Sequence, residues 1–188
     1  MFRKQFVITQ TELDSTNWQT AHINKYNIYV HPDLSLTQAH LNENYFALIG
    51  NLYDWINPQH DNKDILNSLL TATSIEEIFI QINQYAGEYV LICKGFDEFL
   101  LFNDASAQQE VFYDSSINNF ASQPKLLSKV ITPIIDQNPK VVQFFENNFK
   151  KTKLYVGPNT EYSNIKHLRA NHYIDLNRKS SNRFFPLK

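Results

Sequence analysis

The stretch from Gly87 to Leu127, GEYVLICKGFDEFLLFNDASAQQEVFYDSSINNFASQPKLL, decides the fold. It contains four short runs of apolar and aromatic residues, at 89–93, 99–102, 111–113 and 120–122. Gly, Asn, Asp and Ser residues separate these runs, and such a pattern is typical of an antiparallel meander of four strands. The apolar positions are continuous rather than alternating, so we expect both faces of the sheet to be covered.

Further strands and helices are predicted on either side of this stretch. The strands are expected at Phe2–Thr9, Asn27–Val30 and Tyr45–Ile49. Asp61 is a good N-cap for a helix whose buried stripe is Ile65, Leu66, Leu69 and Leu70. Ser74 and Glu77 form a capping-box pattern that opens a second helix, with Ile75, Ile78, Phe79 and Ile82 facing inward. Later helices are expected to begin at Pro124 and at Asn138-Pro139, the second with Val141, Phe144, Phe145 and Phe149 on one side.

The length and composition are those of one globular domain. The chain has 188 residues, of which 43% are hydrophobic and 14% aromatic, which excludes a disordered protein. No apolar run approaches the ~20 residues of a membrane span, and the N-terminus lacks the apolar core of a secretory signal. The single cysteine, Cys93, rules out an internal disulfide framework. We therefore expect a cytoplasmic protein.

Charge is unevenly distributed along the chain. From Lys150 to Lys188 there are nine basic residues against two acidic ones, whereas the preceding part has eight basic and 17 acidic residues. The basic residues are scattered singly among strand-like segments, which favours a solvated surface over a nucleic-acid site. A module for an anionic ligand remains an alternative, using Lys150, Lys151, Lys153, Arg169, Arg178, Lys179 and Arg183.

The order of the landmarks resembles a known enzyme family. Matching positions are Gly87, Phe99 to Asp104, Phe112-Tyr113, Ala121-Ser122 and Leu126-Leu127, followed by the segments Thr160–Leu176 and Arg183–Pro186. The stretch from Leu48 to Pro186 is similar to the glutamine amidotransferase half of glutamine-dependent asparagine synthetases. These are class II amidotransferases of the N-terminal-nucleophile hydrolase superfamily.

This resemblance implies a fold and a domain organisation. The expected fold is α+β, a four-layer αββα sandwich of two mostly antiparallel sheets. Residues 1–188 would form a single amidotransferase-like domain, and the ATP-dependent synthetase domain of the family would be absent, because the sequence stops at Lys188.

The same comparison shows that the catalytic groups of the family are missing. The family nucleophile is an N-terminal Cys exposed by removal of the initiator Met, and Phe2 replaces it here. In the family an Asn side chain and the following Gly N–H form the oxyanion hole. Ile49 replaces this Asn, and Gly50 keeps the backbone half. The family's carboxylate-binding Arg also has no counterpart, because no Arg lies between Asn27 and Gly50.

A vestigial glutamine pocket is predicted at Gly50, Asn51, Asp61, Asn62 and Asp64. Aligning Asp64 with a family Glu puts Asn62 where the α-amino group of glutamine binds, and a shift of one residue puts Asp61 there. Purely structural interpretations are a tight turn at Gly50 and helix capping by Asp61.

Other polar residues are weaker candidates for a site. His60, Asp61 and Asp64 as metal ligands are less favoured than capping, so no metal site is predicted. Cys93 lies in an apolar strand, where desolvation raises its pKa and keeps it inert. His167 and His172 are expected on the surface of a hairpin.

We therefore expect a non-catalytic, degenerate amidotransferase-like domain that docks on or regulates an ATP-dependent synthetase half. The family activity is asparagine synthase (glutamine-hydrolysing). The alternatives are an active amidohydrolase or glutaminase with unorthodox residues and the anionic-ligand module described above. No cofactor, membrane association or nucleic-acid partner is expected, and homo-oligomerisation is left open.

Overall fold

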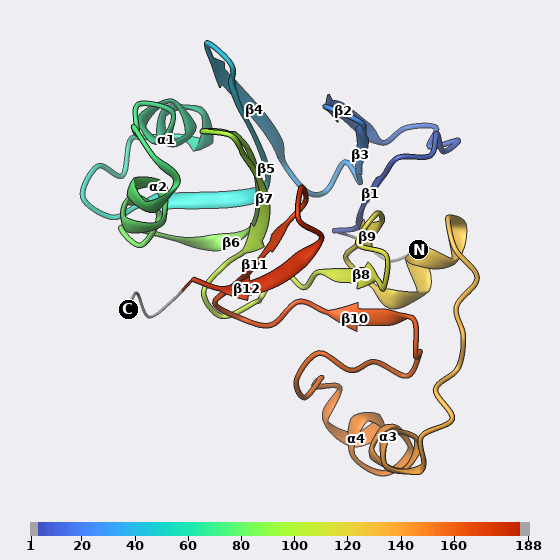
Figure 1. The fold of residues 1–188 in the computed structure, drawn as a ribbon. Helices are drawn as coiled ribbons and strands as arrows, with labels where there is room; N and C mark the ends of the chain where they lie inside the picture. Colours follow the sequence, from blue (N-terminus) through green and yellow to red (C-terminus); the bar gives the residue numbers. More distant parts are fainter. Residues whose placement is uncertain (1–3, 185–188) are drawn as a thin grey trace.

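Two six-stranded antiparallel sheets form the centre of the molecule in the computed structural model, which describes residues 4–184 (Figure 1). Sheet A has the spatial order β10 (Ile165–His167), β8 (Phe112–Asp114), β9 (Phe120–Ala121), β1 (Phe6–Thr9), β3 (Tyr26–Val30) and β2 (Gln19–Ile23). Sheet B has the order β12 (Ser180–Arg183), β11 (His172–Asp175), β7 (Glu98–Asn103), β6 (Tyr85–Gly95), β5 (Asn44–Asp54) and β4 (Leu36–Leu41). The predicted α+β class with antiparallel sheets is confirmed.

The strands of both sheets bury side chains on their two faces, which explains their continuous apolar runs. In β5, Ala47 and Ile49 face the space between the sheets, while Phe46 and Leu48 face the opposite side. Along β1, Phe6 and Ile8 enter the inter-sheet core, whereas Val7 points outward. The expectation that both faces are covered is confirmed. Successive side chains of a strand point to opposite faces, so a continuous apolar run needs cover on both.

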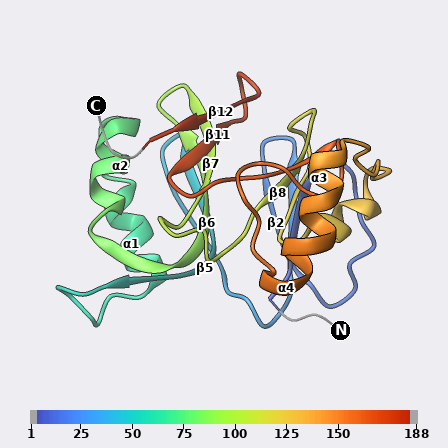
Figure 2. The same ribbon diagram turned by 90° about the horizontal axis from the view of Figure 1, so that it is seen from below.

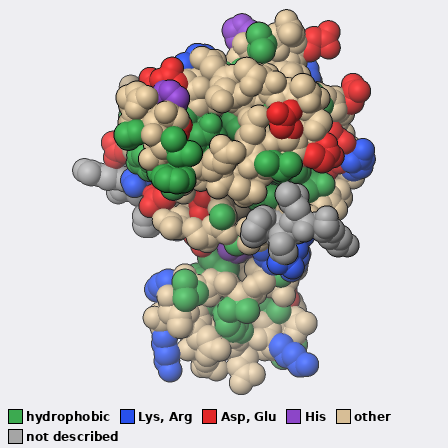
Figure 3. Space-filling view, turned by 90° about the vertical axis from the view of Figure 1, so that its left-hand side faces the viewer, with side chains coloured by type: hydrophobic (Ala, Val, Ile, Leu, Met, Phe, Trp, Pro, Cys, Tyr) green, Lys and Arg blue, Asp and Glu red, His purple; other side chains and the backbone are tan. Residues whose placement is uncertain are grey.

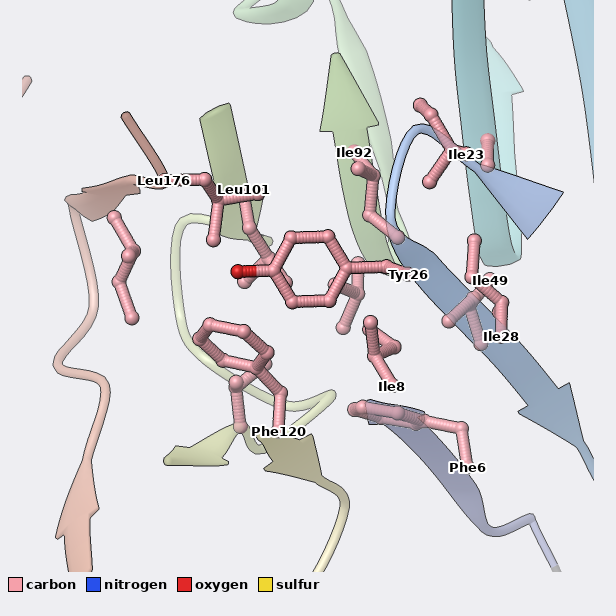
Figure 4. Packing of buried hydrophobic residues seen from close by; sticks show 14 of the residues in the cluster. Phe6, Ile8, Ile23, Tyr26, Ile28, Ile49, Ile92, Leu101, Phe120 and Leu176 are labelled. Carbon is pink, nitrogen blue, oxygen red and sulfur yellow. The ribbon is translucent and has the colours of Figure 1, made fainter. Parts of the chain in front are cut away.

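The inter-sheet core is centred on Tyr26, whose side chain is fully buried. Figure 4 shows the Tyr26 ring among Ile8, Ile92, Leu101 and Phe120, which come from both sheets. The ring meets Phe120 edge-on, with centroids 6.1 Å apart. Contacts from the two sheets to one ring fix how the sheets stack.

Two helices cover the outer face of sheet B (Figure 2). They are α1 (Asn62–Leu69) and α2 (Ile75–Ile82), and each buries its predicted apolar stripe except for Ile75, which is half-buried. Ser74 caps α2 as predicted by accepting a hydrogen bond from Glu77 N. The Glu77 carboxylate bonds Thr73 N and Oγ1 instead of the cap residue's own N–H, so only half of the expected capping box forms.

The outer face of sheet A has a thinner cover. Val7, Phe112 and Ala121 on this face pack against Leu127 of η1 (Pro124–Lys129). The helix predicted at Pro124 is therefore a 3₁₀ helix. The helix predicted at Asn138-Pro139 is confirmed as α3 (Pro139–Phe144), and it continues into a π-helical turn, η2 (Phe145–Phe149), and α4 (Lys150–Thr152).

The predicted four-stranded meander is wrong, because its strands divide between the two sheets. β6 and β7 form a hairpin in sheet B, and β8 and β9 form one in sheet A. The eight residues between β7 and β8 carry the chain across the sandwich, where Val111 enters the inter-sheet core. A periodicity that buries both faces is the same within one sheet and across two, so the sequence pattern did not distinguish them.

The tail differs from expectation in the same way. β10 pairs with β8 in sheet A and β11 pairs with β7 and β12 in sheet B, so Ile165–His167 and His172–Asp175 do not form a hairpin. The predicted first strand also begins later, at Phe6, and Phe2 lies outside the described residues. Strands β2, β4 and β12 carry few apolar residues and were not predicted.

Four buried aspartates close the turns that follow strands. Asp54 accepts from Ile56 N and Asn57 N, and Asp104 accepts from Ser106 N, Gln108 N and Gln109 N. Asp114 and Asp175 bond backbone N–H groups of the turns after β8 and β11. Each carboxylate satisfies donors that would otherwise lack partners, which explains why an Asp stands at or just after the end of each strand.

Among residues 4–184, no helix is long and apolar enough to span a membrane.

Candidate functional site

Three of the five predicted pocket residues, Gly50, Asn51 and Asn62, meet where β5 passes the start of α1. We call this place, made by Ser35, Gly50, Asn51, Leu52 and Asn62, the Gly50 region. Gly50 has φ +98°, and its N–H donates to Ser35 O at 2.9 Å. A Cβ at Gly50 would lie 2.2 Å from Glu88 O on the neighbouring strand β6. The position therefore needs glycine, because both the backbone conformation and the close approach exclude a side chain.

The carbonyl of Gly50 is bonded by two side chains. Ser35 Oγ donates to Gly50 O at 2.5 Å, and Asn62 Nδ2 donates to the same oxygen at 3.1 Å. Ser35 lies just before β4, 15 residues before Gly50. It was missed from the sequence, because no local pattern connects it to the start of α1.

Asn62 uses both ends of its amide inside the protein. Its Oδ1 accepts from Leu52 N at 2.9 Å, and its Nδ2 also contacts Asn51 Oδ1 at 3.2 Å. The residue that the family resemblance placed at the amine of glutamine thus connects α1 to β5. What this amide does here is join two elements.

Asp61 and Asp64 face the helix terminus. Asp61 Oδ1 accepts from Lys63 N at 2.7 Å and from Asp64 N at 2.9 Å, while Asp64 Oδ2 accepts from Asp61 N at 3.2 Å. This is a complete capping box, and the predicted capping role of Asp61 is confirmed.

Ile49 lies fully buried in the inter-sheet core. It pairs with Val90 of β6 and Leu36 of β4, and its side chain belongs to the cluster around Tyr26. The position aligned with the oxyanion Asn therefore directs its side chain into an apolar core, where an amide would lack a partner.

Replacing Asn62 by Ala should lower the free energy of unfolding by about 1–3 kcal/mol, because Leu52 N loses its side-chain partner in a half-buried place and Gly50 O keeps only its bond from Ser35 Oγ. Chemical denaturation of Asn62→Ala checks this. The matched control is Asn67→Ala on the exposed side of the same helix, which should be neutral or slightly stabilising. Equal effects of the two substitutions would show that the Asn62 bonds contribute nothing.

The three residues weighed as metal ligands point to different partners. His60 Nδ1 lies 3.1 Å from Asp54 Oδ2, while Asp61 and Asp64 bond the α1 terminus. In residues 4–184, no group of three or more His, Cys, Asp or Glu side chains is arranged to hold a metal ion.

Cys93 is 1% exposed on the face of β6 that packs under the helices. Desolvation by burial raises the pKa of its thiol, as expected. A buried thiol that stays protonated is a poor nucleophile.

The predicted basic residues do not share one surface. Arg178 bonds Asp175 Oδ2 at 3.0 Å and Glu98 Oε1 at 3.1 Å, and Lys179 Nζ bonds Tyr26 Oη at 3.0 Å. These two side chains connect the turn between β11 and β12 to the rest of the protein. Lys150 and Lys151 in α4, and Lys153 just after it, lie in another part of the molecule (Figure 1).

A pocket of about 280 Å³ lies beyond Gly87, at the end of α2. Its lining includes Tyr85, Tyr89, Asp104, Ser106 and Phe184. The Asp104 carboxylate, however, is taken up by the turn that follows β7. The sequence did not predict this pocket, because its lining comes from segments as far apart as Ile82 and Phe184.

His167 was expected on the surface, but its side chain is only 11% exposed. Its ring stacks on Phe112 with centroids 4.9 Å apart and lies 5.3 Å from the Tyr155 ring. Nε2 has no hydrogen-bond partner among the described residues, and the Glu110 carboxylate lies 3.9 Å away. His172 is half-buried, and its Nδ1 lies 2.9 Å from Ala170 O.

Burial lowers the pKa of His167, so stability should fall as the pH drops through about 6.5, where the unfolded chain takes up the proton first. Burial raises the pKa of Glu110, which acts in the opposite direction, because there the folded protein takes up the proton first. The pH dependence of the wild-type free energy of unfolding combines these two opposite effects, and a comparison with variants separates them.

Urea unfolding at pH 8 and pH 5.5 should show the wild type losing stability relative to His167→Phe at the lower pH. His40→Gln, at an exposed position, is the control and should track the wild type. A difference between wild type and His167→Phe that is the same at both pH values would contradict the assignment.

No protein-family model and no curated protein matches this chain. The resemblance to amidotransferases therefore stays a prediction from the sequence landmarks.

Proposed function

We propose that the protein is a degenerate class II glutamine amidotransferase-like domain with the αββα fold of N-terminal-nucleophile hydrolases. In this role it does not hydrolyse glutamine, and it docks on or regulates an ATP-dependent synthetase half in the cytoplasm. The order of the sequence landmarks, the two stacked antiparallel sheets and the place of β1 inside sheet A support this proposal.

The observation that carries the non-catalytic part is the closure of the Gly50 region. Gly50 N, the backbone half of the predicted oxyanion hole, donates to Ser35 O, and Asn62 bonds both Gly50 O and Leu52 N. The groups that would meet glutamine are thus engaged within the protein. A ligand would have to break these bonds before it could form its own.

The protein also lacks the groups that would catalyse amide hydrolysis. An oxyanion hole needs donors aimed at the developing charge, and the loss of one donor costs about 100- to 1000-fold in rate. Ile49 supplies no donor, and Phe2 supplies no nucleophile. Cys93 cannot serve as the nucleophile in place of the N-terminal Cys of the family, because it is buried under α1 and α2. No observation therefore favours the alternative of an active amidohydrolase.

Ammonia release from glutamine tests the proposal. The purified protein should release no more ammonia than a protein-free control over several hours, and a known glutaminase in the same buffer should release it readily. Ammonia release that follows protein concentration, and that disappears on labelling of Cys93, would contradict a non-catalytic role.

The docking part of the proposal needs its own test. A tagged protein should retain an ATP-dependent synthetase-like chain from a lysate of its own source, as identified by mass spectrometry. Recovery of no such chain, together with a monomer on size exclusion, would contradict docking.

A further inference from the structure

The segment 134–156 forms an arm beside sheet A. Its root is held by Ile134 N, which donates to Asn164 Oδ1 at 2.9 Å, and by Asp136 N, which donates to Glu161 O at 3.0 Å. The rings of Phe145 and Phe149 pack on Tyr155, which meets Phe112 of β8. Figures 1 and 3 show the arm as a lobe set apart from the two sheets.

The arm exposes more apolar surface than its length explains. No residue of α3, η2 or α4 is buried. Ile134, Ile135, Leu154 and Val156 are 56–68% exposed, and they are four of the nine large hydrophobic residues exposed in the described chain. Clusters of this kind on a soluble surface mark interaction sites.

Two hollows flank the middle of the arm. One, of about 210 Å³, is lined by Lys140, Val141, Phe144, Phe145 and Val156, together with Asn159. The other, of about 180 Å³, shares Val141 and Phe145 and adds Ile135 and Val142. The π-helical turn at 145–149 interrupts the helix between α3 and α4, and such turns are frequent at functional sites.

Exposed lysines surround this apolar surface. Lys140, Lys150, Lys151 and Lys153 are exposed, and none of them forms an ion pair with a described acidic residue. The arm itself contains two acidic residues, Asp136 and Glu146. In Figure 3 the lobe shows hydrophobic side chains in its middle and Lys or Arg at its margins.

We propose that the arm is the docking surface for a protein partner, and that it binds a segment with large apolar side chains flanked by Asp and Glu. The apolar side chains would enter the hollows beside Phe145, and the carboxylates would meet Lys140, Lys150, Lys151 and Lys153. This names the contact chemistry of the docking function proposed above, and it rests on that function.

A protein segment fits this surface better than an anionic membrane does. A bilayer meets protruding apolar side chains, whereas the hollows beside Phe145 accept side chains from a partner. Asp136, Glu146 and Glu161 line the second hollow, so this hollow would take apolar side chains of the partner, and the partner's Asp and Glu would lie at the exposed lysines.

The first experiment uses a synthetic probe and fluorescence anisotropy. The probe is an 18-residue amphipathic peptide with Leu on one helical face and Glu elsewhere, and its controls are a Leu/Lys peptide and a scrambled sequence. The Leu/Glu peptide should bind at least tenfold more tightly than either control and should weaken with added salt. Equal binding of the three peptides, or no binding of the Leu/Glu peptide, would overturn the proposal.

Substitutions in the arm test whether the peptide binds there. Leu154→Ser with Val156→Ser, and separately Lys150→Glu with Lys151→Glu, should each weaken peptide binding at least tenfold. Leu41→Ser, at an exposed apolar residue at the tip of the β4–β5 hairpin, should leave it unchanged. All substituted positions are exposed, so equal melting temperatures check that the variants fold. Unchanged binding by both arm variants would overturn the proposal.

Two further outcomes would assign the surface to a different occupant. Phosphatidylserine vesicles that bind in an arm-dependent way, without peptide binding, would indicate a membrane and overturn the proposal. A dimer on size exclusion that Leu154→Ser abolishes, without peptide binding, would indicate a second copy and overturn it as well. If a synthetase-like chain co-purifies equally with the arm variants, docking stands and this surface is wrong. If the peptide binds the arm but no such chain co-purifies, the arm is a binding surface and the proposed docking on a synthetase half is wrong.

Discussion

A Gly50→Ala variant is expected to lose roughly 2–5 kcal/mol of its free energy of unfolding, a large share of the roughly 5–15 kcal/mol typical of a domain. Two causes act together. A left-handed φ costs an L-residue about 1–2 kcal/mol, and forcing apart the tightly packed strands costs about 1–3 kcal/mol more. The contact responsible is that of the new Cβ with Glu88 O at 2.2 Å.

Gly157→Ala is the matched control for this prediction. Gly157 also has positive φ, at +70°, but a Cβ there would meet nothing within 4 Å. The control should therefore lose only about 1–2 kcal/mol, from the backbone conformation alone. Chemical denaturation of both variants measures the difference. Equal losses would show that the close approach of β5 and β6 at Gly50 has no energetic consequence.

The substitution Ile49→Asn, which introduces the amide that the resemblance places at this position, is expected to damage the fold and to add no activity. The substitution removes a fully buried aliphatic side chain, which costs about 2–5 kcal/mol, and it buries an amide without partners, which costs about 1–3 kcal/mol more. The side chain would point toward Tyr26 and Ile92, away from solvent.

The control for this second prediction is Ile49→Val, which should cost about 0.5–1.5 kcal/mol. Thermal or urea unfolding and an ammonia assay are measured on both variants. An Ile49→Asn protein as stable as Ile49→Val, and above all one that releases ammonia from glutamine, would show that this position opens onto a catalytic pocket.

Local features of the fold were predictable from the sequence. Asp61 and Ser74 cap α1 and α2, Asn138 caps α3, and the apolar stripes of α1 and α2 are buried as expected. These signals lie within a few residues of the elements they define, so a single sequence contains them.

Non-local features were not predictable in the same way. Strands β6 to β9 follow one another in sequence, yet the chain changes sheet between Asn103 and Phe112. Both arrangements bury the same side chains, and only tertiary packing around Tyr26 selects between them. His167 was assigned to a surface for the same reason, because its cover comes from Tyr155 in the arm.

Of the five residues predicted for the pocket, Asp61 and Asp64 cap α1, and the other three lie together with bonds that the sequence did not predict. The resemblance brought together Gly50, Asn51 and Asn62, and these three do lie in contact. That Ser35 completes the group, and that Asn62 bonds the backbone of β5, depends on the distance between α1 and the ends of β4 and β5. No sequence spacing reports that distance.

We propose that the Gly50 region is closed to glutamine, and isothermal titration of the protein with glutamine tests this proposal. We predict no saturable heat up to millimolar glutamine, and no change when Asn62→Ala is titrated in the same way. Saturable binding by the wild type that Asn62→Ala weakens would contradict the account, because it would show that Asn62 serves a ligand and not only the bonds it makes to β5.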